Sequence, residues 1–183
     1  MQVYIIDNFL SEEDCDYLIK YYKDYPNKTL PGREINYGST VLLWMEKTPL
    51  FDFKKTWIRY KYLRKIKKDF PYLKLNYDQM VFWPTGSSKP MHKDADIWIT
   101  RNNDWTSVCY LNDDFEGGET LIENEVVKPK KGTLVLFPSA ELFHGVSLVK
   151  KKPRYSFIAW WKENKKDRTP LFNFVNKNNV DNF

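Results

Sequence analysis

The chain has few of the residues that stabilise small secreted proteins or span membranes. Its 183 residues include only two cysteines, Cys15 and Cys109, which are too few for a disulfide framework, so we expect two buried or partly buried thiols. No stretch approaches the roughly 18 consecutive apolar residues of a transmembrane helix, and the N-terminus lacks the charged and then apolar layout of a signal peptide. We therefore expect a soluble, cytoplasmic protein without a membrane partner.

The composition also argues against disorder. Apolar residues make up 42% of the chain and aromatic residues 17%, which is enough for a sizeable hydrophobic core. The simplest division is a single domain over residues 1–183, with helical support over about 1–72, a β core over about 73–162 and a tail over about 163–183. The tail either packs over the core or extends from it, and the oligomeric state does not follow from the sequence.

Helical signals are confined to the N-terminal third. After a predicted strand over residues 2–7, Ser11 is a good N-cap for a helix from Glu12 to about Tyr22, whose first turn is acidic. A second helix is predicted over residues 53–70 by an apolar stripe that recurs every four residues, formed by Ile58, Tyr62, Ile66 and Phe70. We expect the second helix to pack on a sheet.

The segment between the helices, residues 26–50, is rich in proline, glycine and asparagine. It is predicted to form loops, with one or two strands near residues 37–44. A substrate lid and an ordinary surface connection both fit this composition, and the second is more usual.

Beyond Leu73 the pattern is that of short strands separated by turn residues. Strands are predicted over residues 75–83, 97–100, 105–111, 119–123, 126–128, 132–137, 143–149 and 153–161. The paired glycines Gly117 and Gly118 permit the positive φ of a turn before one of these strands. Strands that follow N-terminal helices predict a mainly β fold, namely a jelly roll (double-stranded β-helix, cupin-like) with buttressing helices.

Histidine is as scarce as cysteine, and this scarcity makes the metal-site pattern informative. The only two histidines are His92, which stands two residues before Asp94, and His144. Two imidazoles and one carboxylate on one face of an octahedral Fe(II) leave three positions open for a chelating co-substrate and O2. In an extended segment the side chains at i and i+2 point to the same side, so His92 and Asp94 could bind one ion together with His144. Asp96, two residues after Asp94, is a second carboxylate that would point to the same side of an extended segment.

These residues belong to a longer series of motifs in a fixed order. After the His-x-Asp come Tyr-Leu-Asn at 110–112, Gly-Gly-Glu-Thr at 117–120, Pro-Lys-Lys-Gly at 129–132, His-Gly-Val at 144–146 and Arg-Tyr-Ser at 154–156. With this series, and with an N-terminal segment over residues 3–15, the chain resembles the prolyl 4-hydroxylase-like branch of the Fe(II)- and 2-oxoglutarate-dependent dioxygenases. The resemblance covers roughly residues 3–162.

The resemblance implies a cofactor, co-substrates and residue roles. Fe(II) would be held by His92, Asp94 and His144, and the distal carboxylate of 2-oxoglutarate by Arg154, with O2 as second co-substrate and ascorbate as an accessory reductant. Arg154 suits a carboxylate because its planar guanidinium pairs bidentately, whereas Lys128 and Lys152 are the alternative cations.

Three further positions are candidates for the co-substrate pocket. Tyr110 lies where some relatives place a hydroxyl on the same carboxylate, although a core strand tyrosine is an equal interpretation. Ser156 lies on the strand face of Arg154 and either adds a hydroxyl donor or fills the barrel interior. Trp83 replaces the tyrosine that many relatives have before a Pro-x-Gly turn, and an indole can donate a hydrogen bond but cannot accept one.

The chain has a net charge of +5, and its positive charge is concentrated in the turn over residues 150–152 and on the second predicted helix, which carries Lys54, Lys55, Arg59, Lys61, Arg64, Lys65, Lys67 and Lys68. Such a run is usually a solvated helix face, and an acidic partner or nucleic acid is the alternative.

For the substrate, the resemblance favours a prolyl or other residue in a peptide or protein. A small molecule such as a free amino acid, a nucleic acid and a non-catalytic metal-binding barrel are the alternatives.

Overall fold

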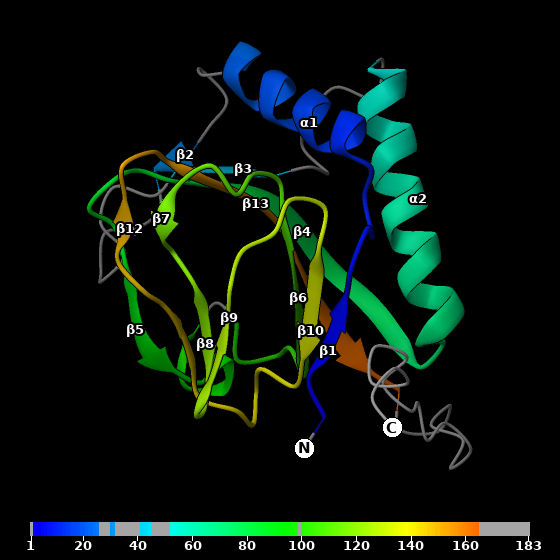
Figure 1. The fold of residues 1–183 in the computed structure, drawn as a ribbon. Coiled ribbons are helices and arrows are strands. Elements are labelled where there is room, and N and C mark those ends of the chain that lie inside the picture. Colours follow the sequence, from blue (N-terminus) through cyan, green and yellow to red (C-terminus); the bar gives the residue numbers. More distant parts are fainter. Residues whose placement is uncertain (1, 26–29, 32–40, 45–51, 99, 165–183) are drawn as a thin grey trace, which may run out of the picture.

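A computed structural model describes residues 2–25, 30–31, 41–44, 52–98 and 100–164 of the chain. Two long helices and many short strands make up the described part (Figure 1). The helices are α1 (Glu12–Asp24) and α2 (Phe53–Asp69), and a short 3-10 helix, η3, covers Asp94–Asp96. The early strands are β1 (Tyr4–Ile6), β2 (Leu30–Pro31), β3 (Val41–Trp44), β4 (Leu73–Trp83), β5 (Lys89–His92) and β6 (Trp105–Tyr110). The later strands are β7 (Glu116–Gly117), β8 (Thr120–Ile122), β9 (Glu125–Val127), β10 (Leu134–Phe137), β11 (His144–Val146), β12 (Val149–Lys150) and β13 (Arg154–Glu163).

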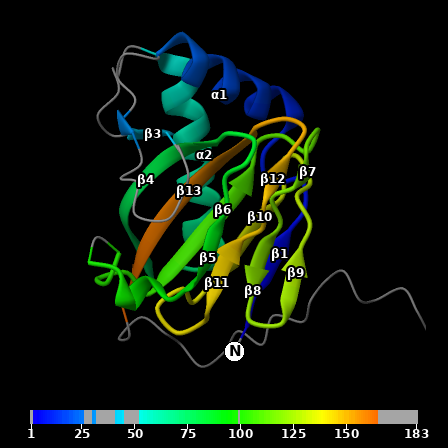
Figure 2. The same cartoon turned by 90° about the vertical axis from the view of Figure 1, so that its left-hand side faces the viewer.

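The strands form two main antiparallel sheets that face each other. The major sheet has the order β1-β10-β6-β13-β4-β3-β2, and the minor sheet has the order β5-β11-β8-β9. Strands β7 and β12 pair separately at one end of the barrel. Figures 1 and 2 show both helices on the outer side of the major sheet, with the minor sheet on the opposite side. This is the predicted jelly roll with buttressing helices.

The major sheet separates two hydrophobic cores. One lies between the sheet and the helices and contains Leu18, Ile58 and Tyr62, whereas the other lies between the sheets and contains Val108 and Phe137. All six residues of β6 are buried, as expected of a strand that is covered on both faces. The barrel interior, where a site can form, therefore has one wall that is fixed from behind by the helices.

Local signals predicted the helices well. The Ser11 side chain accepts a hydrogen bond of 3.1 Å from the Asp14 backbone amide, which confirms it as the N-cap of α1. The predicted stripe of α2 is confirmed, because Ile58, Tyr62, Ile66 and Phe70 are all buried. Cys15 and Cys109 are buried free thiols, as expected.

The prediction of a strand over residues 97–100 is wrong. Ile97 and Trp98 lie in a bend and a turn, and the Thr100 amide donates to the Ile97 carbonyl at 3.0 Å. The Thr100 hydroxyl also donates to the Asp94 carbonyl at 2.9 Å. These local hydrogen bonds form a compact turn where β-branched and aromatic residues had indicated a strand, since β propensity yields to tertiary context.

Two other predictions need adjustment. The segment 143–149 is divided into β11 and β12, and the strand β5 was not predicted. The possible lid over residues 26–50 and the tail beyond residue 164 lie outside the described residues, apart from β2 and β3.

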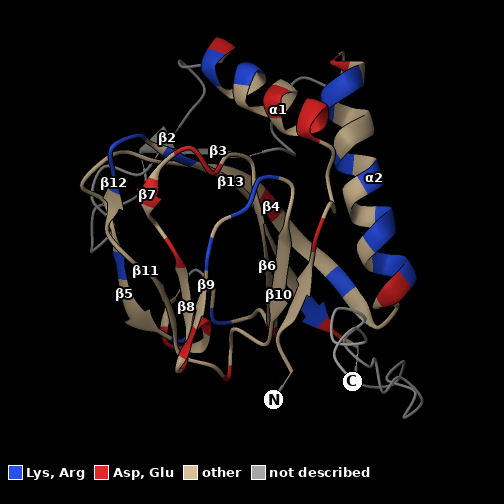
Figure 3. Ribbon diagram, viewed as in Figure 1, with Lys and Arg blue, Asp and Glu red and all other residues tan. Residues whose placement is uncertain are grey.

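The basic residues of α2 do not form one solvated face. Figure 3 shows Lys and Arg along the whole helix, but Lys54 pairs with Glu13 at 2.6 Å and Arg59 with Asp78 at 2.6 Å. Lys61 pairs with Asp14, so three of these cations connect α2 to neighbouring elements.

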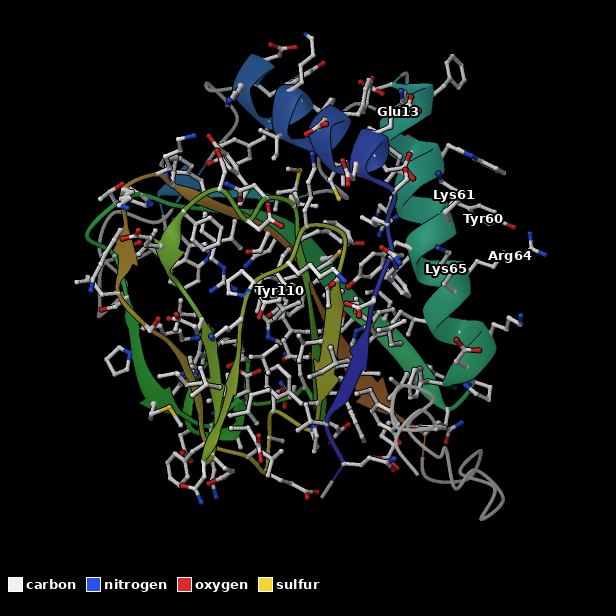
Figure 4. The ribbon with its side chains drawn as sticks, viewed as in Figure 1. Glu13, Tyr60, Lys61, Arg64, Lys65 and Tyr110 are labelled. Atoms are coloured by element: carbon white, nitrogen blue, oxygen red, sulfur yellow. The ribbon has the colours of Figure 1, made fainter. Side chains whose placement is uncertain are left out.

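Two further lysines of α2 also turn toward the body of the protein. Lys65 donates to the Phe9 carbonyl, and Lys55 is almost fully buried. Arg64 is exposed and points away from the body (Figure 4), and Lys67 and Lys68 are exposed as well. The interpretation as a solvated face therefore holds for part of the basic run.

No described helix has the length and apolar character needed to cross a membrane.

Candidate active site

The structure brings His92, Asp94 and His144 together inside the barrel. His92 ends β5 and His144 begins β11, and the two residues are paired across the minor sheet. One ligand atom from each of the three side chains lies within 4.8 Å of the others. The Asp94 Oδ1 atom is 3.7 Å from the Nε2 atom of each histidine. This is a two-histidine, one-carboxylate constellation on neighbouring elements.

Asp94 reaches the histidines by a route that differs from the predicted one. It lies in η3 after β5 has ended, not in an extended segment, and its backbone amide donates to the Ser139 carbonyl at 2.9 Å. The turn aims the carboxylate inward. Asp96, at the end of the same turn, is exposed and does not join the constellation.

Backbone carbonyls orient both imidazoles. The His92 Nδ1 atom is 2.9 Å from the Pro90 carbonyl and the His144 Nδ1 atom is 3.1 Å from the Leu142 carbonyl. A carbonyl can only accept, so in each ring Nδ1 is the donor, which leaves Nε2 as the nitrogen available to a metal. The buried His92 Nε2 atom has no hydrogen-bond partner. Both Nε2 atoms are thus oriented as metal ligands require.

One of the two oxygens of the Asp94 carboxylate accepts hydrogen bonds from neighbouring side chains. Its Oδ2 atom accepts from the Thr106 hydroxyl at 2.7 Å and from the Trp160 indole at 3.1 Å. Thr106 and Trp160 are paired across β6 and β13, so the register of the major sheet sets this support. The Oδ1 atom is left facing the histidines. Neither residue could be found from sequence, since no local pattern marks them.

The local electrostatics favour the protonation states that bind metal. Burial alone would raise the pKa of Asp94, but the imidazoles of His144 and His92 hold it well below its usual range. Burial lowers the pKa of His92, which the Asp94 carboxylate partly offsets. At neutral pH the site therefore presents a carboxylate and a neutral His92 imidazole, and this donor set fits a hard to borderline divalent ion such as Fe(II).

Arg154 is buried in the same pocket on the opposite sheet. Its NH1 group donates to the Gly118 carbonyl at 2.8 Å and its NH2 group lies 3.5 Å from the Thr120 hydroxyl. The buried Nε atom has no hydrogen-bond partner. Burial lowers the pKa of Arg154, and the nearby Tyr110 and Glu119 partly offset this. A buried guanidinium with donor capacity remaining is suited to bind an anion.

Trp83, Tyr110 and Ser156 surround Arg154 in different ways. The guanidinium carbon lies 5.5 Å from the Trp83 ring centroid and 5.1 Å from that of Tyr110, which Figure 4 shows inside the barrel. The Tyr110 hydroxyl donates to Thr120 at 2.6 Å. The Trp83 indole donates to the Ser156 hydroxyl at 3.3 Å, in keeping with an indole that can only donate.

The pocket that these residues form is lined from both sheets. Trp83, Asp94, His144 and Arg154 line it, whereas Tyr110 and Ser156 stand behind the lining. The remaining lining residues are Lys89, Thr106, Val108, Thr120, Phe137, Gly145, Val146, Ile158 and Trp160. Lys128 is exposed, and Lys152 is exposed and paired with Asp114, so neither alternative cation reaches the pocket.

Lys89 was not predicted as a site residue. It is half-buried on β5, and burial lowers its pKa to about 8, an effect that the Asp94 carboxylate partly opposes. Its position could not be read from the sequence, because it depends on an irregularity in the pairing of β5 with β11.

A jelly roll that carries a His-Asp-His constellation and a buried arginine is the architecture of an iron-dependent oxygenase. Residues 75–162 match the family model of the 2OG-Fe(II) oxygenase superfamily. Over this range, which includes the His-Asp-His constellation and Arg154, the chain is similar to a superfamily whose cofactor is Fe(II) and whose co-substrates are 2-oxoglutarate and O2. Curated proteins provide no match to the sequence.

Solved structures with similar folds include several prolyl hydroxylases. A prolyl-4-hydroxylase from Pseudomonas putida aligns with a TM-score of 0.68 and 20% identity over 88% of this chain and 92% of its own. The viral collagen prolyl hydroxylase of Paramecium bursaria Chlorella virus-1 aligns with a TM-score of 0.63 and 22% identity over 90% of this chain and 97% of its own. A Trichoplax adhaerens prolyl hydroxylase was solved with a hypoxia inducible factor peptide fragment. It aligns with a TM-score of 0.72 and 18% identity over 90% of this chain and 84% of its own.

Proposed function

We propose that this protein is a hydroxylase in which His92, Asp94 and His144 bind Fe(II) and Arg154 binds the distal carboxylate of 2-oxoglutarate. The observation that carries the proposal is the orientation of the three ligand side chains. Each histidine has its Nδ1 atom engaged by a backbone carbonyl, and Asp94 has one oxygen engaged by Thr106 and Trp160. A structural cluster would not need three ligand atoms directed at one point.

The residues of the chain would divide the work between binding and positioning. Arg154 would donate to the distal carboxylate from its Nε edge, while Gly118 and Thr120 hold the rest of the guanidinium in place. Tyr110 would act on Arg154 through Thr120 and not on the co-substrate, because its hydroxyl is directed to Thr120. Ser156 would fix the Trp83 indole that covers the guanidinium.

Bound Fe(II) supplies the activation of O2 that couples decarboxylation of 2-oxoglutarate to succinate with hydroxylation of a C–H bond. The chain would contribute a dry environment, since Val108, Phe137, Val146 and Ile158 form apolar walls of the pocket. Such walls exclude water from a reactive centre and strengthen electrostatic interactions within it. The Asp94 carboxylate would keep its charge throughout, because its pKa is held well below the usual range.

For the substrate we propose a prolyl or other residue in a peptide or protein. This is supported by the fold neighbours that are prolyl hydroxylases, one of which was solved with a peptide fragment. We also propose that residues 1–183 form a single domain.

The test begins with the reaction that needs no substrate. Protein incubated with Fe(II), 2-oxoglutarate and ascorbate should slowly release succinate, which NMR can follow, and Asp94→Ala should release none. A peptide library with prolyl and non-prolyl members is then added, and mass spectrometry seeks the gain of one oxygen atom. Hydroxylation of free amino acids or oligonucleotides with no peptide modified would replace the proposed substrate. Absence of iron-dependent succinate would reject the proposed activity.

A further inference from the structure

We propose that Lys89 binds a carboxylate group of the substrate beside the reacting C–H bond, so that the enzyme selects acidic substrates. This inference rests on the proposed function, because it assigns a role within the same pocket. The charged side chains among the described lining residues are Lys89, Asp94 and Arg154.

An irregularity in β5 places Lys89 inside the pocket. His144 pairs with His92, but Val146, two residues later, pairs with Lys89, three residues before His92. One extra residue in β5 therefore forms a bulge, and bulges redirect side chains near active sites. Because His144 and Val146 are on one face of β11, their partners His92 and Lys89 face the same side. A regular strand would turn one of them away.

The bulge also contributes to the metal site. The Pro90 carbonyl inside it is the group that orients the His92 imidazole. Gly145 lies directly opposite, and a Cβ atom there would come within 2.7 Å of the Lys89 carbonyl oxygen. The close packing of β5 on β11 thus fixes the backbone that carries both His92 and Lys89.

Lys89 and Arg154 serve different parts of the pocket. Lys89 is on the minor sheet, where Asp94 is the charged group that acts on it and where Lys89 in turn helps to lower the pKa of His92. Arg154 is on the major sheet, and the groups that influence it are Tyr110 and Glu119. One 2-oxoglutarate needs a single cation for its distal carboxylate, so Lys89 is a second cation at the metal end of the pocket.

The charge balance of the loaded pocket favours an anionic substrate. The dianionic co-substrate would balance the metal ion, and the pocket lining then has two cations, Lys89 and Arg154, against the single carboxylate of Asp94. The lining thus carries one more cation than anion in a surrounding that is largely apolar, where net charge is costly unless a bound anion compensates it. An ammonium group has three donors, so a substrate carboxylate can join the interactions that Lys89 already makes.

The test measures binding and not turnover. The protein is loaded with Mn(II) and 2-oxoglutarate, and the paramagnetic relaxation of probe protons gives both affinity and proximity to the metal. Two matched pairs of probes separate the sources of the carboxylate. N-acetyl-L-proline against N-acetyl-L-prolinamide tests an α-carboxylate, and N-acetyl-L-aspartyl-L-prolinamide against its asparaginyl counterpart tests a side-chain carboxylate.

In the unmodified protein, the acid of at least one pair should bind about tenfold more tightly than its amide, as expected for one charge-assisted contact. Lys89→Met should remove this preference, and Lys89→Arg should retain much of it. Lys128→Met, which alters an exposed lysine, should leave it unchanged. The affinity for 2-oxoglutarate, titrated separately, should be the same in all these proteins.

Three results would overturn the assignment. The first is equal affinity for acid and amide in both pairs, including no binding by any probe. The second is a preference that survives in Lys89→Met. The third is a loss of 2-oxoglutarate affinity in Lys89→Met as large as in Arg154→Met, which would make Lys89 a co-substrate residue. If the unmodified protein did not bind 2-oxoglutarate at all, the proposed function itself would fail, and the separate titration distinguishes that case.

Discussion

Replacing Arg154 with methionine should separate co-substrate binding from stability. The guanidinium is almost fully buried, and its Nε atom has no hydrogen-bond partner. Removing one partner of a desolvated, hydrogen-bonded ion pair costs about 2 to 5 kcal/mol. Affinity for 2-oxoglutarate should therefore fall between about thirtyfold and a few thousandfold. Affinity for the metal alone should change little, because Arg154 is outside the ligand constellation.

Stability of the unliganded protein should respond far less. Methionine removes the hydrogen bonds to Gly118 and Thr120, but it also removes a buried charge whose desolvation is unfavourable. The two effects oppose each other, and we expect the unfolding free energy to stay within about 1 to 2 kcal/mol of the original value. A residue that served only to hold the barrel together would show the opposite pattern, a large loss of stability with unchanged affinity.

The assay is calorimetric titration of 2-oxoglutarate into protein loaded with Mn(II), which binds without turnover. Lys152→Met is the matched control, since it removes an exposed cation that pairs with Asp114. Arg154→Lys retains the charge without the planar fork and should give an intermediate affinity. Unchanged 2-oxoglutarate affinity in Arg154→Met, with Mn(II) binding intact, would refute the assignment of this residue.

Further predictions concern the metal ligands and the helix α2. Asp94→Ala should abolish Mn(II) binding in a folded protein whereas Asp96→Ala should not, and calorimetry with circular dichroism would show either outcome. Thr106→Val should weaken metal affinity about tenfold to a hundredfold by freeing the supported carboxylate oxygen, and an unchanged affinity would remove this residue from the site. Lys61→Glu should lower the unfolding free energy by about 1 to 2 kcal/mol, because it opposes a carboxylate of α1, while exposed Arg64→Glu should not. Equal denaturation midpoints would contradict this last expectation.

The partners of the basic residues of α2 decide which of these residues can be used to test for an acidic partner. The run of lysines and arginines suggested a free cationic surface, yet several of these side chains bind partners on α1, β4 or the N-terminal segment. Reversing such residues together would disturb the packing of α2 and mimic a loss of substrate binding. A nucleic-acid or acidic-protein partner should be tested with Arg64, Lys67 and Lys68, which are exposed, and not with Lys54 or Lys65, which are exposed but bind Glu13 and the Phe9 carbonyl.

The sequence by itself determined the two long helices and indicated the class of chemistry. The helices α1 and α2 followed from an N-cap and an apolar stripe, because helix periodicity is a property of neighbouring residues. Two histidines in 183 residues left few ways to build a metal site, and their order with Asp94 and Arg154 indicated the class of chemistry. These inferences needed residue types and spacing along one chain.

Only the tertiary structure decided how the site is supported and what else reaches it. Asp94 is aimed by a 3-10 turn, its far oxygen is held by Thr106 and Trp160, and Lys89 enters through a bulge in β5. Each of these depends on the register between strands that are distant in sequence. Register is set by which faces become buried and which hydrogen bonds close, so it cannot be read from any single segment. The chemistry was therefore visible in the sequence, whereas the geometry that supports it was not.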